Sequence, residues 1–398
     1  MPSIALYLKT HQPYRIKDYR VFDIGKDHHY FNAPHGHRTN NEDVLKKICE
    51  KSYLPTNAVL LELLERYPDF KLNISLSGTL LEQLEEHSPE TLKTFQDLIK
   101  TGRVEILGET YYHSLSFYYS LTEFEAQVEM HKKIIKRLFN VTPKVFSNTE
   151  LAYRDDLAAW AEKAKYKGII AEGWDPVLGW RSPNFVYAPP NTKKIKLLLK
   201  NYRLSDDIAF RFSNKGWSGW PLTTEKFASW VNQTHGNAET INLFMDYETF
   251  GEHQWADTGI FDFLKHLPRE LYKHKDNSFL TVSETCERYE ARDVVSMPNI
   301  VTWADTERDL SAWTGNTMQQ SSLHELYRIE EKIRDTKDKK LIDDWRKLQT
   351  SDHVYYMCTK WFSDGDVHKY FSPYESPYEA YIAFTNALTD LKLRAGIL

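Results

Sequence analysis

The sequence has few cysteines and no long hydrophobic run. Its three cysteines, Cys49, Cys286 and Cys358, lie far apart and form no CxxC pair of the kind that binds zinc or carries out redox chemistry. An odd number of cysteines without such spacing is typical of a reducing compartment. No apolar run approaches the ~20 residues that a membrane-spanning helix needs. The run that begins at residue 4 is broken by Lys9, so it is too short for a signal peptide and predicts a first strand. We therefore expect a cytoplasmic protein that does not bind membranes.

Positive charge is not in excess either. The chain has 51 Lys and Arg against 56 Asp and Glu, a formal net charge of −5. It therefore offers no basic field for nucleic acids or anionic lipids, and we predict neither as a partner. Aromatic residues are abundant at 14%, with 11 Trp and 24 Tyr. Composition alone favours a large aromatic core; the other interpretation is a groove whose rings stack on the apolar faces of sugars.

Short β-prone apolar runs alternate with amphipathic helical patterns over the first 300 residues. Such alternation predicts a parallel sheet, and the number of units favours a closed barrel over an open sheet. The predicted strands are residues 4–8, 72–76, 104–107, 144–146, 168–171, 195–199 and 241–245, with a further candidate at 279–282. The helical patterns are residues 41–66, 80–100, 122–139, 155–166 and 261–272.

The character of the sequence changes at about residue 300, where polar segments and charged helical patterns follow. The predicted helices there are residues 321–348, about 349–361 and 374–394. We expect a catalytic barrel at residues 1–300 and a helical subdomain at residues 301–398 that completes the active-site cleft.

Polar side chains follow the predicted strands directly. Because the carboxyl ends of parallel barrel strands meet at one rim, where the active sites of such barrels lie, we expect these side chains to converge. The residues in question are His11, Glu109, His113, Glu150, Glu172, Asp206, Asp246 and Glu248.

Two carboxylates that flank a glycosidic bond are the minimum equipment for glycoside hydrolysis. One acts as nucleophile or base, and the other, with a raised pKa, acts as acid. Glu150 and Asp246 are the natural pair because each follows a strand and has aromatic residues nearby. Spacing alone does not select them over Glu105, Glu172 or Asp206.

Five ordered motifs give the sequence a family resemblance over nearly its whole length. They are HQP at 11–13, GRVEILGETYYH at 102–113, FSNTELAY at 146–153, FMDYETFGEH at 244–253, and WADTERDLSAWTGN at 303–316 together with LQTSDHVYYM at 348–357. On these motifs the sequence resembles glycoside hydrolase family 57, the retaining family of α-amylases, 4-α-glucanotransferases, branching enzymes and amylopullulanases. The resemblance implies an incomplete (β/α)7 barrel with a helical C-terminal part. It also implies α-amylase-type hydrolysis of α-1,4-glucans (maltooligosaccharides, starch and glycogen) through a covalent glycosyl-enzyme.

The resemblance also implies roles for single residues. Glu150 would be the nucleophile and Asp246 the general acid/base. Substrate contacts are expected from His11, His113, Glu248 and Asp352, which fall where the family places them. Further candidate contacts are Trp174, Trp255, Trp313 and Asp309. Each of the three tryptophans could stack on a sugar or lie in the core, and Asp309 could instead begin a helix. Many members carry Arg directly after the nucleophile and Trp three residues before it; Leu151 and Ser147 occupy these positions here, so the support of Glu150 is left open.

Three alternatives remain. A 4-α-glucanotransferase would use the same carboxylates and pass the intermediate to a sugar hydroxyl instead of water. A metal-dependent polysaccharide deacetylase or α-mannosidase on a related barrel needs Asp and His ligands near the first strands, whereas HQP is followed by no acid until Asp18. A non-catalytic glucan-binding relative would lack a carboxylate that is present here. We therefore expect no metal and no cofactor, and the sequence does not predict an oligomeric state.

Overall fold

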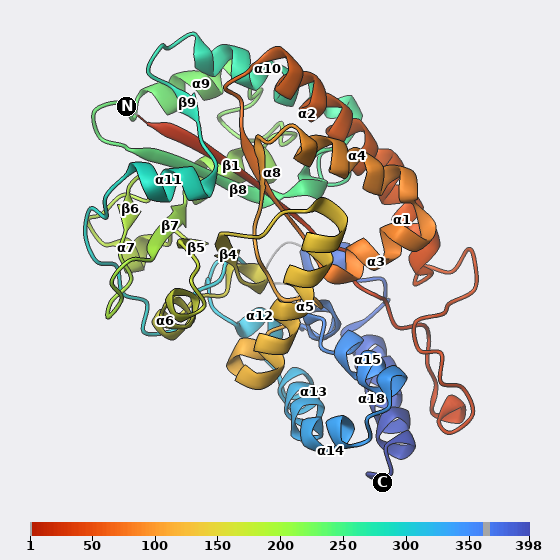
Figure 1. Cartoon of the computed structure of the whole chain (residues 1–398). Coiled ribbons are helices and arrows are strands. Elements are labelled where there is room, and N and C mark those ends of the chain that lie inside the picture. Colours follow the sequence, from red (N-terminus) through yellow and green to blue (C-terminus); the bar gives the residue numbers. More distant parts are fainter. Residues whose placement is uncertain (1, 361–366) are drawn as a thin grey trace.

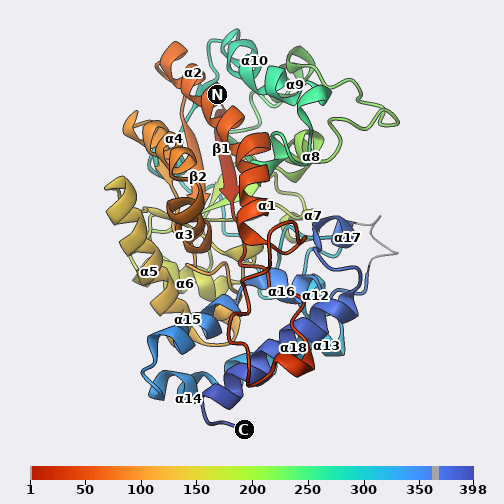
Figure 2. The same cartoon turned by 90° about the vertical axis from the view of Figure 1, so that its right-hand side faces the viewer.

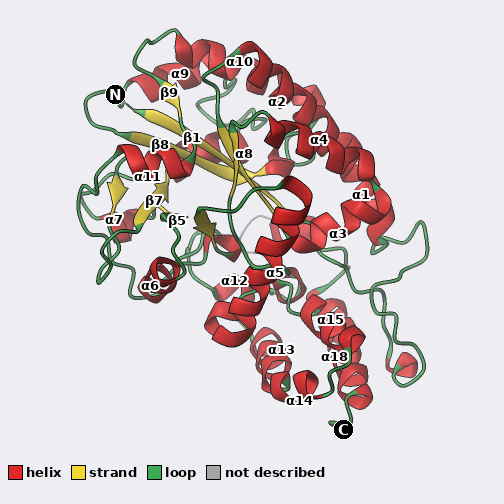
Figure 3. Ribbon diagram, viewed as in Figure 1, coloured by secondary structure: helices red, strands yellow, loops and turns green. Residues whose placement is uncertain are grey.

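The computed structural model describes residues 2–360 and 367–398. The chain forms a mixed α/β fold in which helices surround two β-sheets (Figure 1 and Figure 3). Among these described residues, no helix combines the length and the apolar composition that a membrane crossing requires.

The first sheet is built around β1, which is buried along its whole length. Its strands run parallel in the order β3-β2-β1-β8, and β9 also pairs with β1. Burial on both faces explains why β1 has a continuous apolar run rather than an alternating one. The strands are β1 (Ser3–Thr10), β2 (Leu72–Leu76), β3 (Val104–Ile106), β8 (Thr240–Asp246) and β9 (Ser278–Phe279).

The second sheet has the order β4-β5-β7-β6. Its first three strands are parallel, and β6 runs antiparallel at the edge. The strands are β4 (Val145–Ser147), β5 (Gly168–Glu172), β6 (Val186–Tyr187) and β7 (Lys196–Lys200).

The two sheets adjoin without a continuous ladder between them. One parallel bridge, from Gly108 to Phe146, joins the end of β3 to β4. On the other side, the Asn242 side chain of β8 donates to the Leu199 carbonyl of β7 at 2.8 Å. β3 and β4 have only three residues each, and each pairs along its length with a strand of its own sheet. The mixed α/β fold is confirmed, whereas the ring of the predicted incomplete (β/α)7 barrel is not shown by these hydrogen bonds.

The predicted helices of the first 300 residues are present, with interruptions. The pattern at 41–66 is α1, a π-helical turn (Cys49–Tyr53) and α2, and the pattern at 80–100 is divided before Pro89, which cannot continue the preceding helix. The sequence did not predict α7, α8, α9 or α11, and the candidate strand at 279–282 was wrong beyond Phe279, because β9 ends there and α11 begins at Val282. The helices are α1 (Asn41–Ile48), α2 (Leu54–Arg66), α3 (Gly78–His87), α4 (Pro89–Lys100), α5 (Leu121–Phe139), α6 (Asp155–Lys163), α7 (Asp175–Leu178), α8 (Tyr202–Ala209), α9 (Thr224–Asn232), α10 (Ile260–Tyr272) and α11 (Val282–Arg288).

The C-terminal helices gather at the lower end of the molecule in Figure 1, below the strands, and Figure 2 shows α18 passing along this end. The predicted helix 321–348 is three helices, and of the predicted helix 349–361 only α16 is helical, with residue 361 outside the described residues. The helices are α12 (Ser311–Thr314), α13 (Thr317–Arg328), α14 (Glu330–Asp335), α15 (Lys339–Lys347), α16 (Ser351–Tyr355), α17 (Val367–Phe371) and α18 (Pro377–Arg394).

These helices share a hydrophobic core with the segment that follows β1. Trp345, fully buried on α15, belongs to the same cluster as Ile16, Tyr19 and Tyr30. Hydrogen bonds also join these helices to α5. The buried Glu123 carboxylate of α5 accepts from Arg334 and Arg346 at 2.6 and 2.8 Å. The C-terminal helices are thus packed firmly against the rest of the chain, and the domain boundary at residue 300 stays a prediction.

Candidate active site

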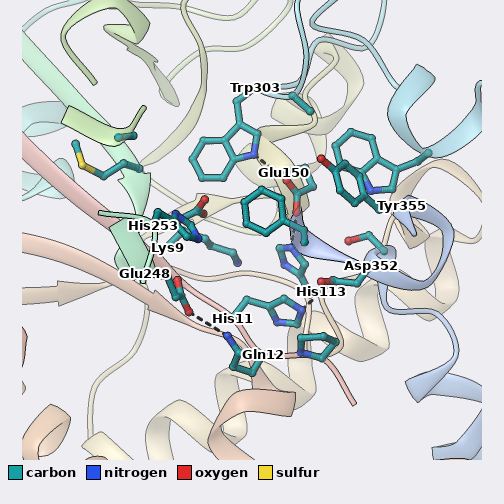
Figure 4. Close-up of a pocket in the computed structure, with 18 of the residues that line it drawn as sticks. Lys9, His11, Gln12, His113, Glu150, Glu248, His253, Trp303, Asp352 and Tyr355 are labelled. Atoms are coloured by element: carbon teal, nitrogen blue, oxygen red, sulfur yellow. Dashed lines mark hydrogen bonds and ion pairs between the residues drawn. The ribbon is translucent and has the colours of Figure 1, made fainter. Parts of the chain in front are cut away.

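A pocket of about 250 Å³ lies where the strand ends meet the C-terminal segments. Figure 4 shows side chains from both parts of the chain pointing into it, among them Glu150, His113, Trp303 and Asp352. The predicted site residues that line it are His11, His113, Glu150, Asp246, Glu248, Trp313 and Asp352. The fold thus brings together residues as far apart in the sequence as His11 and Asp352, which are separated by 341 positions.

Three predicted contacts are not among the residues that line this pocket. Trp255 is 58% exposed, with the Lys51 ammonium 5.2 Å from its ring. Trp174 packs against the hydrophobic cluster of the second sheet. Asp309 precedes α12 and accepts from the backbone N–H of Ser311 at 2.8 Å. The structure gives these three residues local contacts instead of a place in the pocket wall.

Glu150 lies in a short turn directly after β4, with its backbone in the left-handed region. Its φ is 56° and that of Leu151 is 50°. Such angles are costly for residues other than glycine and are often found at functional sites. His113 Nε2 lies 2.8 Å from Glu150 Oε1, and the Trp303 indole N–H donates to Oε2 at 2.7 Å (Figure 4). Burial raises the pKa of Glu150, but these two partners outweigh it and hold the pKa below its usual value.

His113 and Trp303 provide the support of Glu150 that the sequence had left open. Leu151 is buried among apolar residues between the two sheets, and Ser147 Oγ pairs with the Tyr7 hydroxyl at 3.0 Å. Sequence reasoning missed Trp303, whose only signal was its place as the first residue of the WADTERD motif.

Two buried charged side chains, Lys9 and Glu109, lie on the Nδ1 side of His113. The Lys9 ammonium pairs with Glu109, and Glu109 Oε2 lies 3.7 Å from His113 Nδ1. Burial and Lys9 lower the pKa of His113, but its contacts with Glu109 and Glu150 outweigh them and raise it above the usual value. His113 is therefore held as a proton donor toward Glu150 through Nε2.

Asp246 ends β8 and has the opposite electrostatic surroundings. Burial raises the pKa of Asp246 to about 8, and the negative charges of Glu248 and Glu150 add to this effect. Glu248 accepts from the Tyr53 hydroxyl and from Gln12 Nε2, the latter at 3.4 Å. At neutral pH the site thus combines an ionised Glu150 with a protonated Asp246, the division of charge that a nucleophile and a general acid need.

His11 and Asp352 join the end of β1 to α16. His11 Nε2 lies 3.1 Å from Asp352 Oδ2, and Nδ1 lies 2.7 Å from Ser77 Oγ. The His11 ring stacks on His113 with 4.0 Å between centroids. Burial and the neighbouring His113 lower the pKa of His11 to about 4, so the ring is neutral at pH 7. These contacts bring a C-terminal carboxylate to the rim of the strands.

Two groups of side chains in the described part of the chain are spaced to hold a metal ion. They are His11 with His113 and Asp352, and His235 with His274 and Asp276, each with ligand atoms within 4.8 Å of one another. In the first group the imidazoles already bind the carboxylates of Glu150 and Asp352. The expectation of no metal stays a prediction.

Comparisons with known proteins agree with the motifs. The model of "Glycosyl hydrolase family 57" matches residues 5–298. A relative named "Putative alpha-amylase" from Methanocaldococcus jannaschii is 42% identical over 400 residues, which cover 98% of this chain and 84% of the relative. A 4-α-glucanotransferase from Thermococcus litoralis is 24% identical over 64% of this chain and 38% of its own length. The solved structure of an α-amylase from Thermotoga maritima superposes with a TM-score of 0.65 at 14% identity, covering 100% of this chain and 94% of that one, and this likeness concerns the fold alone.

Proposed function

Since the chain belongs to glycoside hydrolase family 57, we propose that it cleaves α-1,4-glucans as a retaining, α-amylase-type enzyme. The observation that carries this proposal is the pair formed by Glu150, kept ionised by His113 and Trp303, and Asp246, kept protonated by burial and neighbouring anions. The name of the 42% identical relative supports α-amylase activity. The proposed substrates are maltooligosaccharides, starch and glycogen.

In the first step Glu150 attacks the anomeric carbon of the glucan. A bond forms between a Glu150 oxygen and C1, and the bond from C1 to the glycosidic oxygen breaks. Asp246 gives its proton to that oxygen, so the leaving sugar departs as a neutral alcohol. The hydrogen bonds from His113 and Trp303 keep the Glu150 carboxylate oriented for the attack.

In the second step water attacks C1 and releases Glu150. Because the ester at Glu150 is neutral, one of the charges that raised the pKa of Asp246 has disappeared. Asp246, now an anion, accepts a proton from the attacking water and regains its first state. Two inversions at C1 leave the product with the α configuration of the substrate.

We also propose that residues 301–398 complete the cleft on an incomplete barrel formed by residues 1–300. Three of their side chains support this: Trp303, Trp313 and Asp352 line the pocket beside the strand ends. Substrate contacts are assigned to the pocket residues His11, His113, Glu248, Trp313 and Asp352.

A 4-α-glucanotransferase is the second candidate, favoured by the relative from Thermococcus litoralis that carries this name. The two activities share the glycosyl-enzyme and differ in whether water or a sugar hydroxyl attacks it.

Product analysis with maltoheptaose, amylose, glycogen and pullulan tests the proposal. We expect only products shorter than maltoheptaose, released with retained anomeric configuration. Products longer than maltoheptaose would show transfer instead. Cleavage of none of these glucans would contradict the proposal, and loss of activity after exhaustive EDTA treatment would favour a metal-dependent reaction.

A further inference from the structure

Trp303 contacts the proposed nucleophile at two points. Its indole N–H donates to Glu150 Oε2 at 2.7 Å, and its backbone N–H donates to the Glu150 carbonyl at 3.3 Å. Nearby, Val301 and Tyr153 exchange backbone hydrogen bonds of 2.8 and 2.9 Å. The segment with Trp303 is therefore in register with the turn of Glu150, and a shift of this segment would move the indole donor away from the carboxylate.

Trp303 begins a loop with no helix or strand, and Arg308 connects this loop to the end of β5 and to α8. The Arg308 guanidinium donates to the Trp303 carbonyl. It lies 3.3 Å from Glu172 Oε2 and 3.4 Å from Asp206 Oδ2, and 5.4 Å from the centre of the Tyr202 ring. The backbone of Arg308 is in the left-handed region, at φ 53°, which a residue other than glycine adopts only where its surroundings enforce it.

Arg308 belongs to a buried cluster of two cations and two carboxylates. The members are Arg308, Lys200, Glu172 and Asp206. Lys200 Nζ lies 3.0 Å from Asp206 Oδ1 and 3.7 Å from Glu172 Oε2, and 5.3 Å from the Trp303 ring. The side chain of Glu172 is fully buried, and that of Arg308 is 14% exposed. Removal of Arg308 alone would leave two carboxylates against one ammonium in a site with little water, which is strongly unfavourable.

We propose that Arg308 is a positioning residue for the nucleophile. Held by Glu172 and Asp206, it fixes the carbonyl of Trp303 and thereby keeps the indole N–H against Glu150. This inference rests on the proposed function, because it concerns transfer of a glycosyl group to Glu150. The alternative is that Arg308 only stabilises the fold by balancing buried charge.

Two variants separate these roles. Arg308→Gln leaves the cluster unbalanced, so both its melting temperature and its turnover should fall. The double variant Arg308→Gln/Glu172→Gln removes one charge of each sign and should regain most of the melting temperature. Its kcat on maltoheptaose should nevertheless stay at least about tenfold below that of the wild type, and its KM should change little. A tenfold decrease is the effect expected when a hydrogen bond to a charged group is lost.

Arg211→Gln is the matched control. Arg211 also pairs with a carboxylate of α8, Asp207 at 2.7 Å, but it makes none of the contacts to Trp303 described above. Its kcat should equal that of the wild type.

A mutant cycle with Trp303→Phe tests whether Arg308 acts through the indole. Trp303→Phe removes the N–H donor and should itself lower kcat. In this background the Arg308→Gln/Glu172→Gln pair should lower kcat by less than about threefold further, because the bond it would disturb is already absent. If the pair lowers kcat by the same factor in the Trp303→Phe background as in the wild type, Arg308 acts by another route, and the proposal is overturned.

A stable double variant with wild-type kcat would also overturn the proposal, since balanced charge would then suffice. If the double variant does not fold, Arg308→Lys decides: it keeps the charge, but its compact ammonium cannot bridge a carbonyl and two carboxylates, so kcat should fall severalfold. Wild-type kcat in Arg308→Lys would contradict the positioning role. An inactive wild type would contradict the proposed function and the inference together, whereas an active wild type with an equally active double variant contradicts the inference alone.

Discussion

At the scale of residues, Glu150 and Asp246 are similar acids with different neighbours. Glu150 faces two donors, His113 and Trp303, which stabilise its anion. Asp246 is buried and faces the anions Glu248 and Glu150, and burial together with these charges opposes its ionisation. The proposed division of roles between the carboxylates therefore rests on their surroundings, and each contact can be removed separately.

The first prediction concerns the nucleophile. Glu150→Gln should lower turnover of maltoheptaose by orders of magnitude without unfolding the protein, because the volume is kept while the attacking oxygen anion is lost. Azide should restore part of the activity of Glu150→Ala and yield a β-glycosyl azide, which NMR identifies. Turnover near that of the wild type in either variant would contradict the assignment.

The second prediction concerns the pH dependence of kcat/KM. Asp246 must carry a proton, so the rate should fall as pH rises through about 8. Glu150 must be ionised, and its lowered pKa puts the acid limb below the usual range of a glutamate. The charged groups that face Asp246 are Glu248, Glu150, Lys200 and His113.

Glu248→Gln provides the check on this assignment. It removes an anion beside Asp246, lowers the pKa of Asp246 and should move the basic limb to lower pH. A basic limb that stays in place would show that another group titrates there.

The motifs singled out Glu150 and Asp246, which the structure places in the pocket, but did not predict what holds them. Glu150 and Asp246 each follow a strand within a short motif, so their position can be read locally. Trp303 lies 153 residues from Glu150, and Lys9 lies 100 residues from Glu109. Such contacts depend on how strand ends and loops meet in space, which no local pattern of residues contains.

At the scale of elements, the strand ends and the C-terminal helices form the site together. The apolar runs predicted the strands well because burial on both faces leaves a clear signal. The helix patterns failed where a proline divided a helix at Pro89 and where α8 and α9 have only 8 and 9 residues. How the two sheets adjoin was not predictable, since it depends on one isolated bridge and on contacts such as that of Asn242 with the Leu199 carbonyl.

The third prediction concerns α16. Asp352→Asn removes the charge that His11 faces at 3.1 Å, so kcat/KM should fall while the melting temperature changes little. Asp335→Asn, an exposed change on α14, should leave both values unchanged. Equal kcat/KM in the two variants would show that Asp352 only packs beside the pocket.

The fourth prediction concerns the junction between α5 and the C-terminal helices. Glu123→Gln leaves Arg334 and Arg346 without their shared anion and should lower the free energy of unfolding by about 3 kcal/mol, as measured by urea denaturation. Glu129→Gln, on the exposed side of the same helix, should change it by less than ~0.5 kcal/mol. A small effect of Glu123→Gln would mean that the hydrophobic cluster alone fixes these helices.

At the scale of the whole molecule, the chain combines two sheets and a C-terminal layer around one pocket. The supports of Glu150 come from both parts, His113 from the strand side and Trp303 from the C-terminal side. A correct pocket therefore requires the complete packing of the chain, which explains why residues distant in sequence share one proposed reaction.

The fifth prediction tests the central claim, that Glu150 and Asp246 act through a glycosyl-enzyme. Asp246→Asn should slow attack on natural glucans strongly but on an activated aryl α-glucoside far less, because the aryl leaving group needs little protonation. Loss of the base then slows release, so the intermediate accumulates. The decisive measurement is intact-protein and peptide mass spectrometry of Asp246→Asn after incubation with this substrate. The account predicts one added glycosyl unit on the peptide that contains Glu150, and none in Asp246→Asn/Glu150→Gln; turnover without an adduct, or an adduct on another residue, would contradict it.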